Sequence, residues 1–171
     1  MMFLFLIGLP GCGKSFWLHQ LAEALHFTPV DLDNRIEHTY RTTIPLLFEK
    51  GEPFFRLKEK ETLEALLLTP GNIIVATGGG TPCFHNNMAK MQAAGVVIYL
   101  KSSIGHIAGR LAANDSRPLL PGRERKKEKT EKLEALLQQR QPTYEQASLI
   151  VDADNITLPI FVALLQPFLK T

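Results

Sequence analysis

A glycine-rich stretch near the start of the chain constrains the fold more than any other feature. Residues 8–15 read Gly-Leu-Pro-Gly-Cys-Gly-Lys-Ser, which is the spacing of a phosphate-binding loop. A short apolar run precedes it at 2–7, and a stretch with helical periodicity follows at 14–26. Strand, glycine loop and helix in this order predict a nucleoside triphosphate site; a glycine-rich turn that binds no ligand is the alternative.

Each residue type in this loop suits phosphate. The glycines let the backbone adopt positive φ, so that several N–H groups face one anion, and the helix that begins near Lys14 adds its positive dipole end. The Lys14 ammonium can reach the β- and γ-phosphates, and the Ser15 hydroxyl can ligate Mg²⁺. The residues that we expect to contact the nucleotide here are Gly11, Cys12, Gly13, Lys14, Ser15 and Phe16.

The bulk composition is that of one globular domain. The 171 residues are 45% hydrophobic and 21% charged, and the formal net charge of +2 gives no general affinity for nucleic acid or a membrane surface. No apolar run approaches the roughly 20 residues that a membrane span needs. The two cysteines, Cys12 and Cys83, are too few for a metal cluster. We therefore expect a cytoplasmic protein that binds neither nucleic acid nor membrane.

Apolar runs alternate with helical periodicity along the chain. The runs with the length of strands are 3–7, 27–30, 73–76, 96–100 and 149–151. The helical stretches are about 14–26, 33–40, 44–50, 53–68, 86–94, 104–113, 131–139 and 155–169. This alternation predicts an α/β fold with a parallel sheet covered on both faces. Ligands bind beyond the carboxyl ends of such strands, so the glycine loop, Asp31 with Asp33, and residues 78–80 should meet in one crevice.

Two carboxylates, Asp31 and Asp33, follow the second predicted strand. Alternation along an extended segment would put both on the same side. One could then hold a water on Mg²⁺ while the other orients a hydroxyl nucleophile or accepts its proton. The alternative role for Asp33 is to cap the helix that follows it.

Two arginines are candidates for binding an anionic acceptor. Arg56 and Glu59 are three residues apart and can touch on one helix face. They form either a surface pair worth about 0.3–0.5 kcal/mol or a pair in which Glu59 orients the guanidinium toward a carboxylate. Arg140 lies in the last turn of a helix that we expect Pro142 to end, where it either complements the helix dipole or binds the acceptor.

Three successive glycines, 78–80, end the third predicted strand. Such a run is costly in backbone entropy unless something must approach the main chain closely. The glycine N–H groups could meet a substrate oxygen, or the run could form only a tight turn.

The segment 117–132 has an unusual composition. It holds seven basic and three acidic residues, so it carries about +4. It is either a solvated loop that leads into a charged helix, or a mobile lid that closes over phosphates. In the second case Arg117, at its edge, supplies charge to the transferring group.

Together these motifs resemble the shikimate kinase family. In chain order they are residues 8–15, Asp31-x-Asp33-x-x-Ile36-Glu37, Ile44-x-x-Leu47-Phe48-x-x-x-Gly51-Glu52, Phe55-Arg56-x-x-Glu59, Thr77-Gly78-Gly79-Gly80, Val97-x-Tyr99-Leu100, Arg117-Pro118-Leu119-Leu120, Arg140-x-Pro142-x-Tyr144 and Val151-Asp152. The resemblance implies a single three-layer α/β/α domain over 1–171 with a five-stranded parallel sheet, the P-loop kinase fold. It also implies an acceptor-binding segment at about 31–60 and a lid at about 114–128.

The resemblance further implies an activity and residue roles. The activity is MgATP-dependent phosphorylation of the 3-hydroxyl of shikimate, on the route to aromatic amino acids, by a monomer. The implied shikimate contacts are Asp33, Arg56, Gly79 and Arg140, the phosphate contacts are Lys14 and Arg117, and the Mg²⁺ contacts are Ser15 and Asp31. Asp33, Lys14 and Arg117 would then be the catalytic residues.

The sequence departs from the family pattern at three places. Phe16 replaces a small hydroxyl residue, which alters the contacts expected near the α-phosphate, and Leu32 replaces a small polar residue, which alters the expected pocket wall. The stretch from Arg117 to Arg140 is longer than expected and very basic. The alternatives from the residues alone are another small-molecule kinase, for gluconate or a nucleotide, and a nucleotide-binding module without catalysis.

Overall fold

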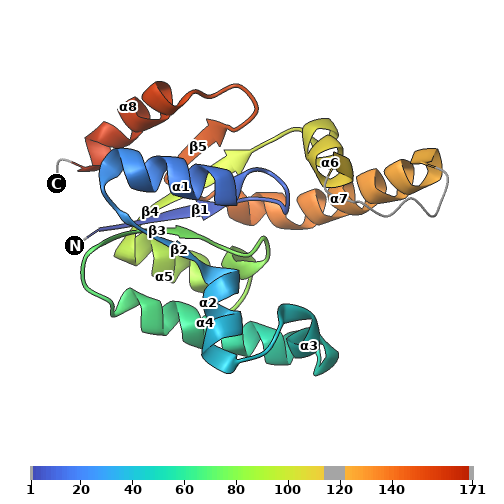
Figure 1. Cartoon of the computed structure of the whole chain (residues 1–171), viewed down its shortest axis with the longest axis horizontal. Helices are drawn as coiled ribbons and strands as arrows, with labels where there is room; N and C mark the ends of the chain where they lie inside the picture. Colours follow the sequence, from blue (N-terminus) through green and yellow to red (C-terminus); the bar gives the residue numbers. More distant parts are fainter. Residues whose placement is uncertain (1, 114–121, 170–171) are drawn as a thin grey trace.

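A computed structural model describes residues 2–113 and 122–169, which form a parallel sheet with helices on both faces (Figure 1). The strands are β1 (Met2–Ile7), β2 (Thr28–Asp31), β3 (Asn72–Ala76), β4 (Gly95–Lys101) and β5 (Leu149–Asp152). They form one five-stranded sheet in the order β2-β3-β1-β4-β5, with every pair parallel. The fold class predicted from the sequence is confirmed.

The helices fill the intervals between the strands. They are α1 (Lys14–Leu25), α2 (Leu32–Tyr40), α3 (Ile44–Glu49), α4 (Glu52–Leu67), α5 (Asn87–Ala94), α6 (Ile104–Ala113), α7 (Gly122–Tyr144) and α8 (Leu158–Leu169), with a short 3₁₀ turn, η1 (Thr81–Cys83). In Figure 1, α1 and α8 cover one face of the sheet, and α5 and α4 lie on the other. Within the described ranges, no helix is long and apolar enough to cross a membrane.

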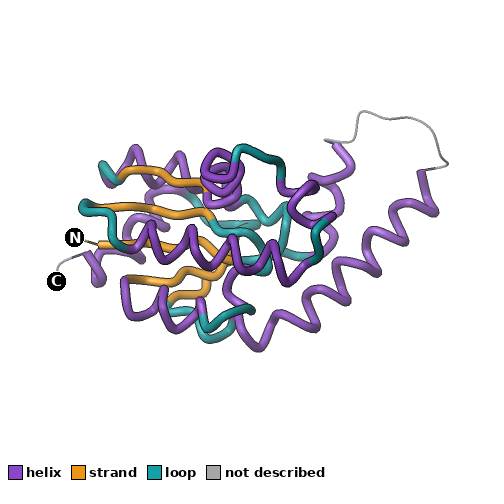
Figure 2. Tube along the Cα trace, turned by 90° about the horizontal axis from the view of Figure 1, so that it is seen from below, coloured by secondary structure: helices purple, strands orange, loops and turns teal. Residues whose placement is uncertain are grey.

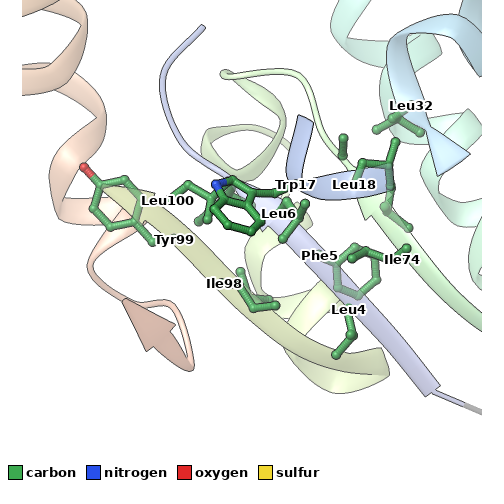
Figure 3. Packing of buried hydrophobic residues seen from close by; sticks show 14 of the residues in the cluster. Leu4, Phe5, Leu6, Trp17, Leu18, Leu32, Ile74, Ile98, Tyr99 and Leu100 are labelled. Carbon is green, nitrogen blue, oxygen red and sulfur yellow. The ribbon is translucent and has the colours of Figure 1, made fainter. Parts of the chain in front are cut away.

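The central strand β1 anchors the core. Its residues Phe3 to Ile7 are at most 1% exposed, as expected for a central strand covered on both faces. Figure 3 shows Leu6 near Trp17 and Leu18 of α1, with Ile74 and Ile98 on the strands that flank β1. This packing supplies a rigid base for the glycine loop that follows β1.

Helix α7 is longer at both ends than the sequence indicated. It begins at Gly122, where 131 was expected, and it continues through Pro142 to Tyr144. The prediction that Pro142 ends the helix is therefore wrong. A proline lacks the N–H that would bond four residues back, but this loss falls in the last turn, and the Glu145 N–H donates to the Gln141 carbonyl at 2.9 Å.

The last helix begins later than predicted, at Leu158 rather than 155. The Asn155 and Ile156 N–H groups donate instead to the Asp152 carbonyl, at 3.4 and 3.1 Å. These bonds form a turn directly after β5, which delays the start of α8.

The segment predicted as a lid is divided between described and undescribed residues. Residues 114–121, which include Arg117, lie outside the described part of the chain. Residues 122–128 are helical and belong to α7. The described parts of α6 and α7 lie side by side, and α7 projects away from the sheet (Figures 1 and 2).

Candidate active site

The segments that follow β1, β2 and β3 line one cleft of about 560 Å³ at the carboxyl edge of the sheet. The predicted site residues among its lining are Gly11, Gly13, Lys14, Ser15, Phe16, Asp31, Asp33 and Gly79. The predicted meeting of these three segments in one crevice is confirmed. It follows from the parallel arrangement, in which all strands end at the same edge.

The glycine loop has the backbone that an anion site needs. Gly8 has a φ of 141°, and a Cβ there would lie 2.8 Å from the Leu100 carbonyl oxygen, so no larger residue fits. Gly13 is in the left-handed region at a φ of 103° and directly precedes α1. The Trp17 N–H donates to the Gly13 carbonyl at 3.0 Å. The N–H groups before Trp17 belong to the first turn, which leaves donors available to phosphate oxygens.

Lys14 folds back over its own loop. Its Nζ donates to the carbonyl oxygens of Gly8 and Leu9 at 2.9 and 2.8 Å, and lies 3.7 Å from the Cys12 sulfur. The Cys12 side chain is fully buried beneath the loop, so we expect this residue to meet a nucleotide through its backbone. These hydrogen bonds hold the Lys14 ammonium against the loop that we expect to bind phosphate.

Arg110 is a residue that the sequence reasoning missed. It lies on α6, lines the cleft, and donates from Nη1 to the Cys12 carbonyl at 3.2 Å. The packing of α6 on the loop is close, since a Cβ at Gly11 would lie 3.0 Å from Leu111 Cγ. An arginine on an amphipathic helix carries no signal in the sequence that distinguishes it from a surface residue.

Asp154, in the loop after β5, fixes this end of α6. Its carboxylate accepts from the Ser103 N–H and from His106 Nδ1, both at 2.8 Å, and from the Ser102 hydroxyl. Arg110 Nη2 lies 3.6 Å from the same carboxylate. Burial alone would raise the pKa of Asp154, but the hydrogen bonds outweigh it and hold the pKa well below its usual range.

Asp31 and Asp33 both line the cleft, but a strand-to-helix turn brings them together. Asp31 ends β2 and caps α2, where its Oδ1 accepts from the Asn34 N–H at 3.1 Å. Asp33 lies in the first turn of α2. The alternative that Asp33 caps this helix is therefore wrong, and so is the expectation that both residues share an extended segment.

The environment of Asp33 raises its pKa to about 6. Burial is the largest cause, followed by the negative charges of Asp31 and Glu59; the positive charges of Lys14 and Arg56 offset part of the rise. A carboxylate with a raised pKa holds a proton more readily, which suits a group that accepts one from a hydroxyl.

We predict that the Asp33→Asn variant is more stable than the wild-type protein at neutral pH. The folded pKa lies above the unfolded value, so ionisation of Asp33 opposes folding. The free energy of unfolding that the wild-type protein loses through this ionisation is close to zero below about pH 4. It grows as the pH rises to about 6, and then stays constant near 2–3 kcal/mol. Urea unfolding at pH 4.5 and 7.5, without Mg²⁺ and nucleotide, measures it. A stability difference between variant and wild type that does not grow with pH would contradict the prediction.

Arg56 is a buried residue of helix α4 with only 5% of its surface exposed, so the alternative of a surface pair is wrong. Its Nη1 donates to Glu59 Oε2 at 2.9 Å, and its Nε and Nη2 donate to Glu52 Oε1 at 3.1 and 3.0 Å. Glu59 is fully buried and also accepts from the Thr81 hydroxyl at 2.6 Å. The Phe84 ring packs on the guanidinium, 4.2 Å from Cζ to the ring centre.

The glycines 78–80 are required by the close approach of other side chains, since none of the three has a φ in the left-handed region. A Cβ at Gly78 would lie 3.0 Å from an Asp33 carboxylate oxygen, and one at Gly79 would lie 3.0 Å from Arg140 Nη1. A Cβ at Gly80 would lie 2.7 Å from Arg56 Cζ. The three glycines thus form a turn against which the proposed acceptor residues pack, while the expectation that their N–H groups meet a substrate oxygen stays a prediction.

Arg140 reaches the same turn from α7. It lies in the penultimate turn of that helix, and its Nη1 occupies the space that a side chain at Gly79 would need. The two arginines, which come from distant parts of the chain, therefore lie against neighbouring glycines of one turn, although neither arginine is among the residues that line the cleft itself.

Phe16 and Leu32, the two described residues that depart from the family pattern, have different surroundings. Phe16 is 61% exposed, lines the cleft and packs edge-on against Trp17 at 5.2 Å between ring centres. Leu32 is fully buried in the hydrophobic core. The expectation that Leu32 forms part of the pocket wall is wrong, because its side chain packs inward from α2.

Comparison with known proteins gives a consistent result. The family model described as "Shikimate kinase" matches residues 10–166. A shikimate kinase of Parabacteroides distasonis is 36% identical over 154 residues, which cover 89% of this chain and 88% of the relative. The crystal structure of a shikimate kinase from Bacteroides thetaiotaomicron is similar with a TM-score of 0.85 and 30% identity over 99% of both chains. A shikimate kinase from Acinetobacter baumannii, solved in complex with shikimate, gives a TM-score of 0.83 and 29% identity over 99% of this chain and 94% of that one.

Proposed function

Because the chain belongs to the shikimate kinase family, we propose that it transfers the γ-phosphoryl group of ATP to the 3-hydroxyl of shikimate in the cleft described above. The observation that best supports these residue assignments is the glycine turn 78–80. Asp33, Arg56 and Arg140 all pack against this turn, next to the phosphate-binding loop. A carboxylate and two guanidinium groups suit an acceptor that carries both a hydroxyl and a negative charge.

On the nucleotide side, the loop residues Gly11 to Phe16 bind the phosphates. Backbone N–H groups at the start of α1 hold the phosphate oxygens, and Lys14 exchanges its loop carbonyls for the β- and γ-phosphates. Arg110, placed over the loop, adds a second positive charge beside the nucleotide. These charges act in a cleft partly shielded from water, where their effect is larger than in bulk solvent.

The donor atoms in this cleft fit Mg²⁺. Ser15 and Asp31 offer a hydroxyl and a carboxylate oxygen, which are the hard ligands that this ion prefers. Within the described residues no cluster of three or more carboxylate, histidine or cysteine side chains could hold a metal by itself. This agrees with an ion that is held largely by nucleotide phosphates and water. When bound, Mg²⁺ neutralises charge on the phosphates.

On the acceptor side, Arg56 and Arg140 hold the carboxylate of shikimate, and the Gly79 N–H contacts the substrate. Glu59 and Glu52 fix the Arg56 guanidinium before the substrate arrives, so little side-chain entropy is lost on binding. Asp33 orients the 3-hydroxyl and accepts its proton as the phosphorus–oxygen bond forms, and ADP leaves with the bond electrons. Positioning and electrostatics supply most of the catalysis.

The remaining assignments concern the chain as a whole. We propose a single catalytic domain with an acceptor-binding segment at about 31–60 and a lid at about 114–128, from which Arg117 reaches the transferring phosphoryl group. We also propose that the protein acts as a monomer. Cys12 and Cys83 are free thiols, which supports the cytoplasmic location that we propose.

Gly80→Ala should weaken both shikimate binding and folding, because it adds one methyl group beside Arg56. The backbone at Gly80 is right-handed helical, so alanine fits the φ and ψ angles. The new Cβ, however, would lie 2.7 Å from Arg56 Cζ, and the buried guanidinium is held by two carboxylates and cannot easily move. We expect a fall of about 1–3 kcal/mol in the free energy of unfolding and a KM for shikimate raised about tenfold or more.

The matched control for this substitution is Gly109→Ala. Gly109 lies in α6, where a Cβ would meet nothing within 4 Å. Alanine there should leave both KM values unchanged and raise the unfolding free energy by about 0.4–1 kcal/mol. Equal effects of the two substitutions on the KM for shikimate would contradict the role given to Gly80.

A panel of acceptors tests the proposed function directly. Shikimate, gluconate and AMP are each incubated with the protein and MgATP, and the products are followed by ³¹P NMR. The proposal predicts one new phosphate ester, on the 3-hydroxyl of shikimate, and no product with the other two. A phosphate ester formed on gluconate or AMP while shikimate stays unreacted would overturn it.

A further inference from the structure

We infer that the hydroxyl of Tyr144 is a positioning group for the acceptor end of the cleft, where it holds Gly79 and Arg140 in place for the substrate carboxylate. This inference rests on the proposed function. Tyr144 is the last residue of α7 and is fully buried. Its hydroxyl donates to the Gly79 carbonyl oxygen at 2.5 Å, across 65 residues of sequence.

The hydrogen bond, and not the packing of the ring alone, makes this contact specific. The Tyr144 ring packs against the Tyr99 ring of β4, with 5.0 Å between ring centres and 38° between planes. Phenylalanine would satisfy that packing equally well. The hydroxyl instead holds the Gly79 carbonyl, which belongs to the Gly79–Gly80 peptide group, and so ties the glycine turn to the end of α7.

Arg140 is part of the same contact. It lies four residues before Tyr144 on α7, so the two side chains share one helix face. A Cβ at Gly79 would lie 3.0 Å from Arg140 Nη1, which shows how closely the guanidinium lies over this backbone. The Tyr144 hydroxyl therefore sets the distance between the last turn of α7 and the glycine turn, and with it the position of Arg140.

The surroundings keep this hydroxyl a neutral donor. Burial raises the pKa of Tyr144 well above its usual value, and the positive charge of Arg140 offsets only part of the rise. A phenol that stays protonated can donate to the carbonyl across the whole working pH range.

The test compares two substitutions, Tyr144→Phe and Tyr99→Phe, each of which removes one hydroxyl oxygen from this pair of packed rings. Tyr144→Phe should raise the KM and the calorimetric Kd for shikimate about three- to tenfold, the range expected for one hydrogen bond. Its KM for ATP should stay within about twofold of wild type, since the phosphate loop is untouched. Tyr99→Phe removes the other hydroxyl of this ring pair, and the hydrogen bond from Tyr144 to the Gly79 carbonyl stays intact. The Kd of Tyr99→Phe for shikimate should therefore equal that of wild type.

A second comparison separates positioning from general structure. If Tyr144 acts partly through Arg140, the effect of Tyr144→Phe on the Kd should shrink in an Arg140→Lys background. A wild-type Kd and KM for shikimate in Tyr144→Phe, whatever its melting temperature, would overturn this inference and leave the proposed function intact. Wild-type protein that neither binds nor phosphorylates shikimate would overturn the proposed function, and this inference with it.

Discussion

Asp33→Asn should lower the kcat for shikimate phosphorylation by about 10²–10⁴-fold, the usual contribution of a positioned general base. Asparagine keeps the size of the side chain and can still hydrogen-bond the 3-hydroxyl, but it cannot accept its proton. The KM for ATP should change little, because the nucleotide contacts are assigned to Lys14, Ser15 and the loop backbone. Steady-state kinetics with each substrate varied in turn measures both quantities.

The control for this variant is Asp31→Asn. Asp31 lies in the same cleft and caps α2, but its assigned role is on the side of the metal and nucleotide. Asp31→Asn should therefore change the dependence of the rate on Mg²⁺ concentration, which Asp33→Asn should leave unaltered. A kcat within tenfold of wild type in Asp33→Asn would remove Asp33 from the proton transfer.

Arg140→Ala should raise the KM for shikimate by about 30-fold or more, with little change in the KM for ATP. Truncating one partner of a buried, hydrogen-bonded charge pair costs about 2–5 kcal/mol, largely because the other charge is left unpaired. Here the substrate carboxylate would lose one of its two assigned arginine partners and keep only Arg56. The side chain of Arg140 is only half-buried in the free protein, so the variant should still fold.

Arg140 is a better choice for this experiment than Arg56. Arg56→Ala would leave the fully buried carboxylate of Glu59 without its cation. Such a loss typically costs about 3–5 kcal/mol of stability, so binding and folding could not be separated. Arg140→Lys is the matched variant: it keeps the charge but not the planar, bidentate donor pair, and should lie between wild type and Arg140→Ala. Similar increases in the KM for ATP and for shikimate in Arg140→Ala would contradict the assignment.

The parts of the fold that could be predicted from the sequence are those that depend on local patterns. The run before Gly8 is a central strand because it is apolar throughout, and the periodicity after Lys14 is that of a packed helix. The convergence of the glycine loop, Asp33 and residues 78–80 followed from the rule that parallel strands end at one edge. These predictions needed no knowledge of tertiary contacts.

The features that were missed depend on contacts between distant segments. Arg110 lies over the phosphate loop only because α6 packs there, and the Phe84 ring lies on Arg56 only because η1 follows the glycine turn. The three glycines are needed because side chains from α2, α4 and α7 crowd against them, which no spacing in the sequence reveals. The prediction that Pro142 ends α7 is wrong because a proline destabilises the last turn of a helix less than its interior.

The measurement that tests the central claim most directly is ADP production from MgATP, with and without shikimate, in wild type and Lys14→Ala. Wild-type protein should release ADP at a rate that depends on shikimate and saturates with it. Lys14→Ala should lose this rate, because the charge that Lys14 holds over the phosphate loop is gone. ADP release by folded wild-type protein that is indifferent to shikimate, or an undiminished shikimate-dependent rate in Lys14→Ala, would contradict the account.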